Sequence, residues 1–349
     1  MVIQVLTPDE KLAALKWPRM ESMDYIALAP EDWFIVCAGF EDRTLGVLER
    51  EVGSQTLFRV LLILYKPSVP ENKEEEIREI CRRAGIQPIE VIYNRHDQAG
   101  FGRVLLEKLG SCRGRVVVDV SAMSRLLIVQ VLVALGSRAE GFRNCFVAYA
   151  EAKFYPPSQA EAEAELARSE SDPTLSILFL SSGVFGVSVV PELSASGMPG
   201  AQTRLISFPT LDDHHLIALR AELQPSRFSF IEGVPRRPEN KWRQEFIKRM
   251  NRLADIKDAE ICETSTLLYE ETLNCLLELY RKHAVRERLV LSPTGSKMQT
   301  VAVGVFRTFV TDVQIVYPTP RGFRSPENYT RGVDELHLLS LEVFGLDES

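Results

Sequence analysis

The sequence has few cysteines, and none of them forms a recognisable metal or redox motif. Its six cysteines include no Cys-x-x-Cys pair, and no histidine stands at zinc-finger spacing from them. Cys37, Cys145 and Cys262 lie in apolar, strand-like runs, where a cysteine ordinarily acts as a small buried hydrophobic residue. The sequence therefore predicts no metal site and no cofactor.

Long apolar runs and an excess of basic charge are missing as well. The most apolar helical segment, Leu126 to Leu135, is too short to span a bilayer and contains Gln130. The first residues lack the basic and then apolar pattern of a signal peptide. We therefore expect a cytoplasmic protein that binds no membrane. Because 41 Lys and Arg stand against 48 Asp and Glu, general binding of duplex nucleic acid is disfavoured.

What the sequence does contain is an internal repeat. Residues 70–73, Pro-Glu-Asn-Lys, recur at 238–241, and Tyr149 recurs at the same offset as Tyr317. In each half, short β-branched runs alternate with helix-like segments of about ten residues. The expected strands are Phe34–Ala38, Val60–Tyr65, Pro88–Tyr93, Val116–Val120 and Cys145–Tyr149, then Leu205–Phe208, Phe228–Ile231, Ala259–Glu263, Arg288–Ser292 and Val313–Tyr317.

This alternation predicts an α/β fold with two tandem Rossmann-like domains, each a doubly wound parallel sheet, related by internal duplication as a pseudo-dimer. The first domain is expected at 1–158, with 177–190 as its final strand. An acidic helix that is expected to be a solvated surface helix, a strand and a flexible loop at Ser194–Ala201 fill the linker, 159–203. The second domain is expected at 204–349, with Gly332–Leu339 as its final strand.

The loop after the expected strand Arg288–Ser292 is the first candidate site. It contains Thr294, Gly295, Ser296, Lys297 and Gln299 and opens the apolar helix Lys297–Phe309. Glycine permits close approach of the backbone to a ligand, and a helix N-terminus with a lysine suits an anion. It is not a Walker A loop. The alternative interpretation is an ordinary helix cap with a surface lysine.

The first half has an equivalent loop. It contains Asp119, Ser121, Ser124 and Arg125, and the last two align with Ser296 and Lys297. A hydroxyl followed by a cation at both positions favours ligand binding over a chance cap. The carboxylate of Asp119 could accept from a ribose or orient Arg125; alternatively, it could bond to local backbone N–H groups.

The turn after the first strand is the third candidate site. There Gly39, Glu41 and Arg43 are expected to line the rim of the site, and Glu41, Asp42 and Arg43 are weak catalytic candidates. The acidic pair could instead favour the following helix electrostatically. The second half has Asp212, Asp213, His214 and His215 at this point, and adjacent helical histidines cannot share a face.

Thr294–Met298, and more weakly Asp119–Arg125, resemble the ligand-binding loop of CARF domains, the CRISPR-associated Rossmann-fold sensors. The resemblance implies a ligand similar to cyclic oligoadenylate, bound across the two halves of one chain by this loop and the first β-turn. It also implies a role in antiviral defence, with a protein effector as partner. Ser296 departs from the family pattern, and no effector domain is recognisable.

Three functions are therefore compatible with the sequence. The first is a binding module for a nucleotide-like anionic ligand, held by Arg125 and Lys297. The second is an enzyme acting on a nucleotide or phosphodiester in an inter-domain cleft, with Glu41 or Asp42 as the base. The third is a non-catalytic scaffold subunit.

Overall fold

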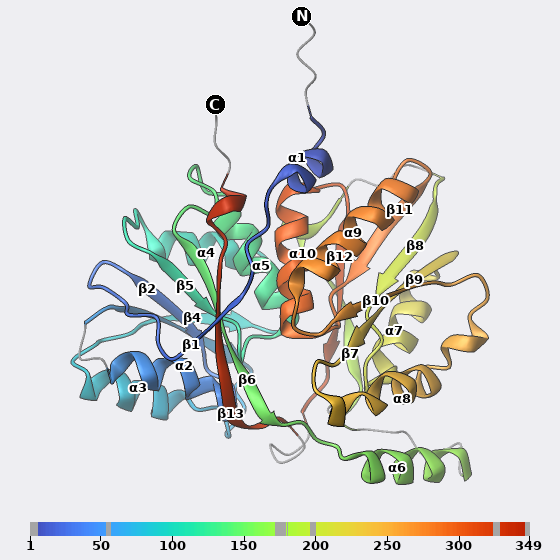
Figure 1. Ribbon diagram of the computed structural model, residues 1–349, viewed down its shortest axis with the longest axis horizontal. Coiled ribbons are helices and arrows are strands. Elements are labelled where there is room, and N and C mark those ends of the chain that lie inside the picture. The colour runs from blue at the N-terminus through green and yellow to red at the C-terminus, as the bar shows by residue number, and fades with distance from the viewer. Residues whose placement is uncertain are drawn as a thin grey trace, which may run out of the picture. The chain divides into compact units, whose positions relative to one another are not determined.

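The chain forms two separate sheets, each with its own helices (Figure 1). The computed structural model describes residues 6–53, 57–171, 179, 181–195, 200–323 and 329–345. We call Leu15–Tyr155 together with Tyr329–Ser349 domain A, and Met1–Ala14 together with Pro156–Asn328 domain B. The predicted α/β class is confirmed.

Domain A contains a sheet of seven strands in the order β1-β13-β6-β5-β2-β3-β4. The strands β2 to β6 are parallel to one another. At one side β13 is antiparallel to β6, and β1, at the edge, is antiparallel to β13. The strands are β1 (Glu21–Met23), β2 (Trp33–Cys37), β3 (Arg59–Lys66), β4 (Ile89–Asn94), β5 (Val116–Asp119), β6 (Cys145–Phe154) and β13 (Arg331–Ser340). The helices are α2 (Arg43–Val52), α3 (Glu74–Arg83), α4 (Phe101–Leu109) and α5 (Arg125–Gly136), followed near the end by a 3-10 turn at Glu342–Phe344.

Domain B contains a sheet of six strands in the order β10-β9-β8-β11-β12-β7, and only β7 is antiparallel to its neighbour. The strands are β7 (Val184–Val189), β8 (Gln202–Ser207), β9 (Arg227–Val234), β10 (Glu260–Ser265), β11 (Glu287–Ser292) and β12 (Gln314–Pro320). The helices are α1 (Pro8–Ala14), α6 (Gln159–Ser171), α7 (Asp213–Leu223), α8 (Trp242–Met250), α9 (Tyr269–His283) and α10 (Lys297–Phe309), with 3-10 turns at Pro191–Leu193, Pro238–Asn240 and Leu253–Asp255.

The five parallel strands have the same spatial order in both domains. Numbered along each half, β4-β3-β2-β5-β6 and β10-β9-β8-β11-β12 both read 3-2-1-4-5, which is the order of a doubly wound Rossmann-like sheet. The expected strands and helices therefore occur where the repeat places them. Descent of both domains from one duplicated unit stays a prediction.

The predicted domain boundaries are wrong, because the two final strands are exchanged. The strand expected to complete the first domain is described as β7, and it pairs with β12 of domain B. The strand expected to complete the second domain is β13, and it pairs with β6 of domain A (Figure 1). Each of the two strands pairs antiparallel with the fifth parallel strand of its sheet; β7 forms the edge of its sheet, whereas β13 is itself followed by β1.

Buried apolar side chains form the interior of each domain. In domain A, α2 and α3 pack on one face of the sheet through Val47, Leu48, Ile77 and Ile80. In domain B, Leu216 and Leu219 of α7 pack against β8, β9 and β11. Cys37 and Cys145 are buried as predicted, whereas Cys262 on β10 is only half-buried.

The acidic helix α6 differs from the prediction of a simply solvated helix. Its apolar positions Ala162 and Leu166 are buried against Phe246 and Met250 of α8, and only its charged face is exposed. The flexible loop expected at Ser194–Ala201 lies partly outside the described residues, because 196–199 are not described.

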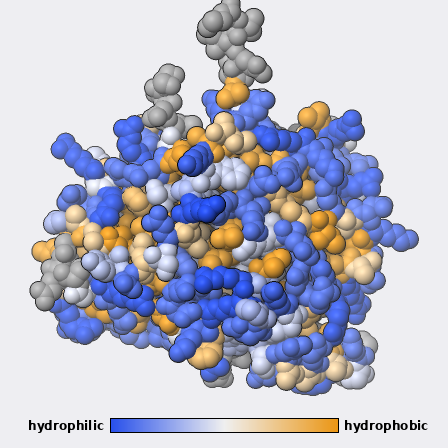
Figure 2. Space-filling model, in the orientation of Figure 1, coloured by the Kyte–Doolittle hydropathy of each residue, from blue (hydrophilic) through white to orange (hydrophobic). Residues whose placement is uncertain are grey.

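The surface drawn in Figure 2 is mainly hydrophilic, with hydrophobic side chains dispersed among polar ones. The strongly exposed large hydrophobic residues are spread over several elements and loops, for example Tyr25, Ile92, Ile217 and Val285. Among the described helices, none combines the length and apolar character needed to cross a bilayer.

Candidate functional site

The predicted loops meet at the switch point of each sheet, where strand 1 lies beside strand 4. In open α/β sheets, ligands bind outside the carboxyl ends of the strands at this point. In domain A the switch point lies between β2 and β5, and in domain B between β8 and β11. The loops chosen from the sequence follow these four strands, so their placement is correct.

In domain A the two loops touch each other. A Cβ atom built on Gly39 would lie 2.8 Å from Cβ of Ala122. Glycine at position 39 therefore allows the turn after β2 to pack against the turn after β5. This contact accounts for the glycine without a ligand.

Asp119 has a local structural role. The carboxylate is 1% exposed, and its Oδ1 accepts hydrogen bonds from the Ser121 N–H at 2.9 Å and the Ser121 hydroxyl at 2.5 Å. The Ser121 oxygen in turn accepts from the backbone N–H of Ala150 on β6 at 2.8 Å. The structure thus favours the alternative interpretation of Asp119, as a partner for local backbone and hydroxyl groups.

Ser124 caps α5, and its own N–H is already engaged. The backbone N–H of Ser124 donates to the Tyr65 hydroxyl oxygen at 2.6 Å, while its side chain accepts from the N–H of Leu127 at 3.4 Å. Burial raises the pKa of Tyr65 well above its ordinary value, so this hydroxyl keeps its proton. Arg125, half-buried, is the first residue of α5.

The domain B loop is held by its own side chains. Thr294 donates its hydroxyl proton to the Phe208 carbonyl at 2.7 Å, which joins the loops after β8 and β11. Ser296 and Gln299 form a capping box. A Cβ atom on Gly295 would lie 2.5 Å from Oε1 of Gln299 and 2.8 Å from the Phe208 ring, so this glycine also serves internal packing.

The alternative interpretation of this loop, a helix cap with a surface lysine, places Lys297 on the surface, but the structure buries it. It is only 7% exposed. The reason is the placement of α10, because each residue from Lys297 to Arg307 is buried and the first turn is no exception. Arg125, in the same position of domain A, is more accessible.

Glu41 and Asp42 hold the exchanged strand β13 in place. Asp42 accepts from the backbone N–H of Gly332 at 2.9 Å, and Glu41 accepts from the hydroxyl of Thr330. Glu41 also accepts from Nε of Arg43 at 2.8 Å. Both carboxylates therefore stabilise the position of β13 and its preceding residue, which weighs against a role of either one as a general base.

Arg43 is buried at the carboxyl end of the domain A sheet. Its Nη1 lies 3.3 Å from the Tyr149 hydroxyl, and the guanidinium carbon lies 5.8 Å from the centre of the Tyr149 ring. Burial opposes the charged form, but Glu41 and Tyr149 outweigh it and raise the pKa of Arg43 above its ordinary value. The guanidinium is therefore a fixed cation.

A neighbouring cluster on β6 and β13 was missed by sequence reasoning. It comprises Glu151, Glu335 and His337, and the ring of Tyr149 stacks on His337 with centroids 6.2 Å apart. These residues were assigned to different halves of the chain, so no local spacing pointed to the cluster. Only the strand exchange brings them together.

The equivalent turn of domain B contains a second polar cluster. Asp212 is 2% exposed and accepts from the Ser181 hydroxyl. Nε2 of His214 lies 3.9 Å from Asp213, and Nε2 of His215 lies 3.7 Å from Asp212. The two histidines thus face different carboxylates, as the helical spacing predicts. Burial raises the pKa of Asp213.

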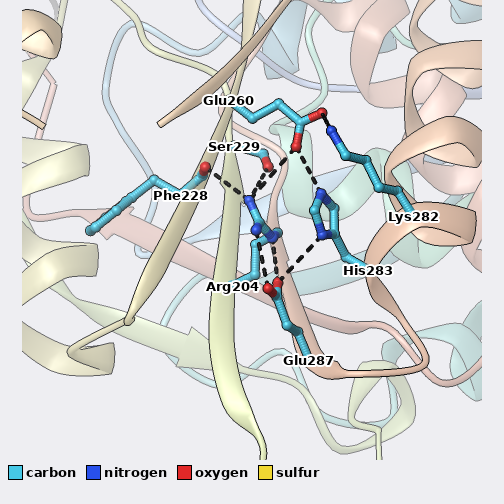
Figure 3. A network of polar contacts seen from close by, with 7 residues as sticks. All are labelled: Arg204, Phe228, Ser229, Glu260, Lys282, His283 and Glu287. Atoms are coloured by element: carbon cyan, nitrogen blue, oxygen red, sulfur yellow. Dashed lines mark hydrogen bonds and ion pairs between the residues drawn. The ribbon is translucent and has the colours of Figure 1, made fainter. Parts of the chain in front are cut away.

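An ion network around the buried Arg204 lies at the opposite, amino ends of the domain B strands. Figure 3 shows Arg204 of β8 between Glu260 of β10 and Glu287 of β11. Arg204 Nη1 also donates to the Ser229 hydroxyl at 3.0 Å, and His283 Nε2 lies 2.7 Å from Glu260. Since ligands bind at the other ends of the strands, we interpret this network as structural.

A pocket of about 370 Å³ in domain A also lies at the amino ends of its strands. Its lining includes Trp33, Arg59 and Ile89. The Arg59 guanidinium carbon is 5.6 Å from the centre of the Trp33 ring. None of the predicted site residues lines this pocket.

Comparison with known proteins identifies no family. No family model matches the sequence, and no curated protein matches it. Among solved structures, the cytoplasmic domain of a prokaryotic cation chloride cotransporter is similar at 10% identity and a TM-score of 0.21, covering 86% of this chain and 98% of that one.

Two further solved structures show comparable similarity. YwfH, an NADPH-dependent reductase involved in bacilysin biosynthesis, has 10% identity and a TM-score of 0.22 over 84% of this chain and 99% of its own. Phosphoethanolamine N-methyltransferase 1 of Haemonchus contortus has 8% identity and a TM-score of 0.21 over 95% and 90%. Such low scores carry no argument about function, and the fold assignment rests on the strand order.

Proposed function

We propose that each domain binds a phosphate-bearing nucleotide at its switch point, and that the protein is a CARF-like sensor or subunit. The observation that carries this proposal is the repeated cation. Arg125 and Lys297 each begin the helix that follows strand 4 in a sheet of the same strand order. The helix dipole adds positive potential at both positions.

The structure changes which groups would hold the ligand. The N–H groups of Ser124 and Ser296 donate within the protein, to Tyr65 and to Gln299. Side-chain charge and the helix dipole therefore replace these backbone donors in the proposal. A role in antiviral defence with a partner effector rests on the CARF resemblance alone.

The test is calorimetric titration with a cyclic oligoadenylate, and separately with ATP. Arg125→Ala and Lys297→Met each remove one cation, and methionine suits the buried position because it retains an unbranched apolar side chain. We expect affinity to fall about tenfold or more in each variant, since hydrogen bonds to charged groups contribute about 1.5–3 kcal/mol. Lys108→Ala is the matched control, because Lys108 is exposed in the last turn of α4.

Two results would contradict the proposal. The first is no binding of either probe to the wild-type protein. The second is equal affinity in Lys108→Ala, Arg125→Ala and Lys297→Met, with circular dichroism showing that all three are folded. Mass spectrometry of small molecules released from protein purified from its native host would identify the ligand directly.

A further inference from the structure

A buried histidine faces two glutamates on neighbouring strands of domain A. His337 of β13 lies directly opposite Tyr149 of β6. The ladder pairs Leu336 with Ala150 and Val333 with Ala152, with an irregularity between these pairs. Glu335 lies in this irregular stretch, and a carboxylate oxygen of Glu335 is within 4.8 Å of the ligand atoms of Glu151 and His337. Figure 1 shows β6 and β13 side by side. The three polar side chains therefore converge at the β6–β13 pair.

The imidazole of His337 lies near both glutamates without a hydrogen bond to either. Nε2 of His337 is 3.6 Å from Oε2 of Glu151 and 3.7 Å from Oε2 of Glu335, beyond the usual hydrogen-bond length. One ligand atom from each residue lies within 4.8 Å of the others. His337 is 4% exposed, and within the described parts of the chain its Nε2 has no hydrogen-bond partner.

The unpartnered imidazole nitrogen and the two neighbouring carboxylates both favour a bound cation. Two carboxylates side by side on neighbouring strands repel each other. A buried nitrogen without a partner costs about 1–3 kcal/mol. A metal ion bonded to all three groups removes both costs.

The spacing fits a small transition metal. Zinc binds histidine nitrogen and carboxylate oxygen at about 2.0–2.2 Å, so ligand atoms at two corners of a tetrahedron lie roughly 3.3–3.5 Å apart. The observed separations of 3.6 and 3.7 Å are close to this value. The stacked ring of Tyr149, inclined by 18° to that of His337, holds the imidazole plane.

We propose that Glu151, Glu335 and His337 form a binding site for a divalent transition metal ion such as Zn²⁺. Three protein ligands leave a fourth position for water or a bound molecule. The Glu335 side chain is 43% exposed and provides the path of entry. The expectation of no metal, drawn from local spacing, could not include a site whose ligands are separated by the whole of domain B.

The test is zinc binding by the full chain. Protein stripped with a chelator is titrated with ZnCl₂ against a fluorescent zinc indicator, and bound metal is counted by mass spectrometry. Glu335→Gln retains the size of the side chain and removes one ligand at a partly exposed position. We expect it to bind zinc at least about 100-fold more weakly, since loss of even an outer-shell partner costs 10–100-fold.

Asp334→Asn is the matched control, because Asp334 is the exposed neighbour on the same strand. It should bind zinc as the wild type does, and zinc should raise the melting temperature of both but not of Glu335→Gln. Glu151→Gln provides a second ligand variant should Glu335→Gln fail to fold. The proposal is overturned if the wild type binds no zinc, or if a folded ligand variant and Asp334→Asn bind it equally well.

Discussion

The backbone N–H of Gly332 donates a hydrogen bond of 2.9 Å to the carboxylate of Asp42, although 290 positions separate them in the sequence. Gly332 lies near the start of β13, and Asp42 lies immediately before α2. The turn after β2 therefore binds β13, the last strand in the chain. An acidic residue that resembled a catalytic candidate in the sequence instead anchors the exchanged strand.

Replacement of Asp42 should loosen β13. Asp42→Ala removes the acceptor of the Gly332 N–H, and we expect the free energy of unfolding of domain A to fall by about 1 kcal/mol. Hydrogen exchange of the β13 amides, followed by mass spectrometry, measures the effect. Asp97→Ala, at an exposed position after β4, is the control. Equal exchange rates in the two variants would show that the contact does not hold the strand.

Removal of Arg204 should destabilise domain B and alter its dependence on pH. Arg204→Met leaves the carboxylates of Glu260 and Glu287 beside a vacated cation position, at a cost of about 3 kcal/mol. Urea unfolding at neutral pH measures this loss. If Arg204→Met unfolds at the wild-type urea concentration, the network is not structural.

The same network predicts the direction of acid destabilisation. The hydrogen bond from Arg204 lowers the pKa of Glu287. Burial would raise the pKa of Glu260, but Lys282 and His283 lower it overall. The stabilisation is thus present above the unfolded pKa of glutamate, about 4.3, and is lost as the pH falls through the lower folded values. The acid transition should be shallower in Arg204→Met than in the wild type.

A methyl group at Gly295 should disturb the domain B loop. The added Cβ would overlap Gln299 and the Phe208 ring, and overpacking of this kind costs about 1–3 kcal/mol. Gly186→Ala is the control, because a Cβ there meets nothing within 4 Å. Thermal unfolding of the two variants compares them directly. Equal melting temperatures would mean that the loop adjusts without cost.

Loss of the Tyr65 hydroxyl should leave the N–H of Ser124 without its acceptor. We expect Tyr65→Phe to lower the free energy of unfolding by about 1–3 kcal/mol, the cost of a partly buried donor left unsatisfied. Tyr25→Phe, at a tyrosine that is 57% exposed, should have no comparable effect. Denaturant titration distinguishes the two, and an equal response would refute the role of this hydrogen bond.

Local sequence patterns predicted the helices and strands well. They did not predict which sheet the last strand of each half joins. The helix Lys297–Phe309 begins and ends as predicted, because caps and periodicity are local properties. The sheet that the final strand of each half joins is not a local property. β7 and β13 carry similar apolar and polar alternation, and the sheet that each joins is decided by tertiary packing.

The candidate site was predicted with similar limits. The loops containing Gly39, Ser124 and Gly295 were correctly placed at the switch points, because strand order follows from βαβ connectivity. Their hydrogen-bond partners, such as Tyr65 for Ser124, belong to other elements. The sequence of the loop alone therefore could not predict them. For the same reason, the neighbours of His337 could not be recognised before the pairing of β13 with β6 was known.

The strand exchange also sets an order of events during synthesis. All strands of domain B are synthesised before β13. By contrast, β6 is synthesised in the first half of the chain, and it lacks its neighbour β13 until the end of synthesis. Domain B can therefore complete its sheet first, although it comes second in the chain. Until then the open edge of β6 is a template for pairing with another copy, so slow translation between residues 155 and 331 should favour aggregation.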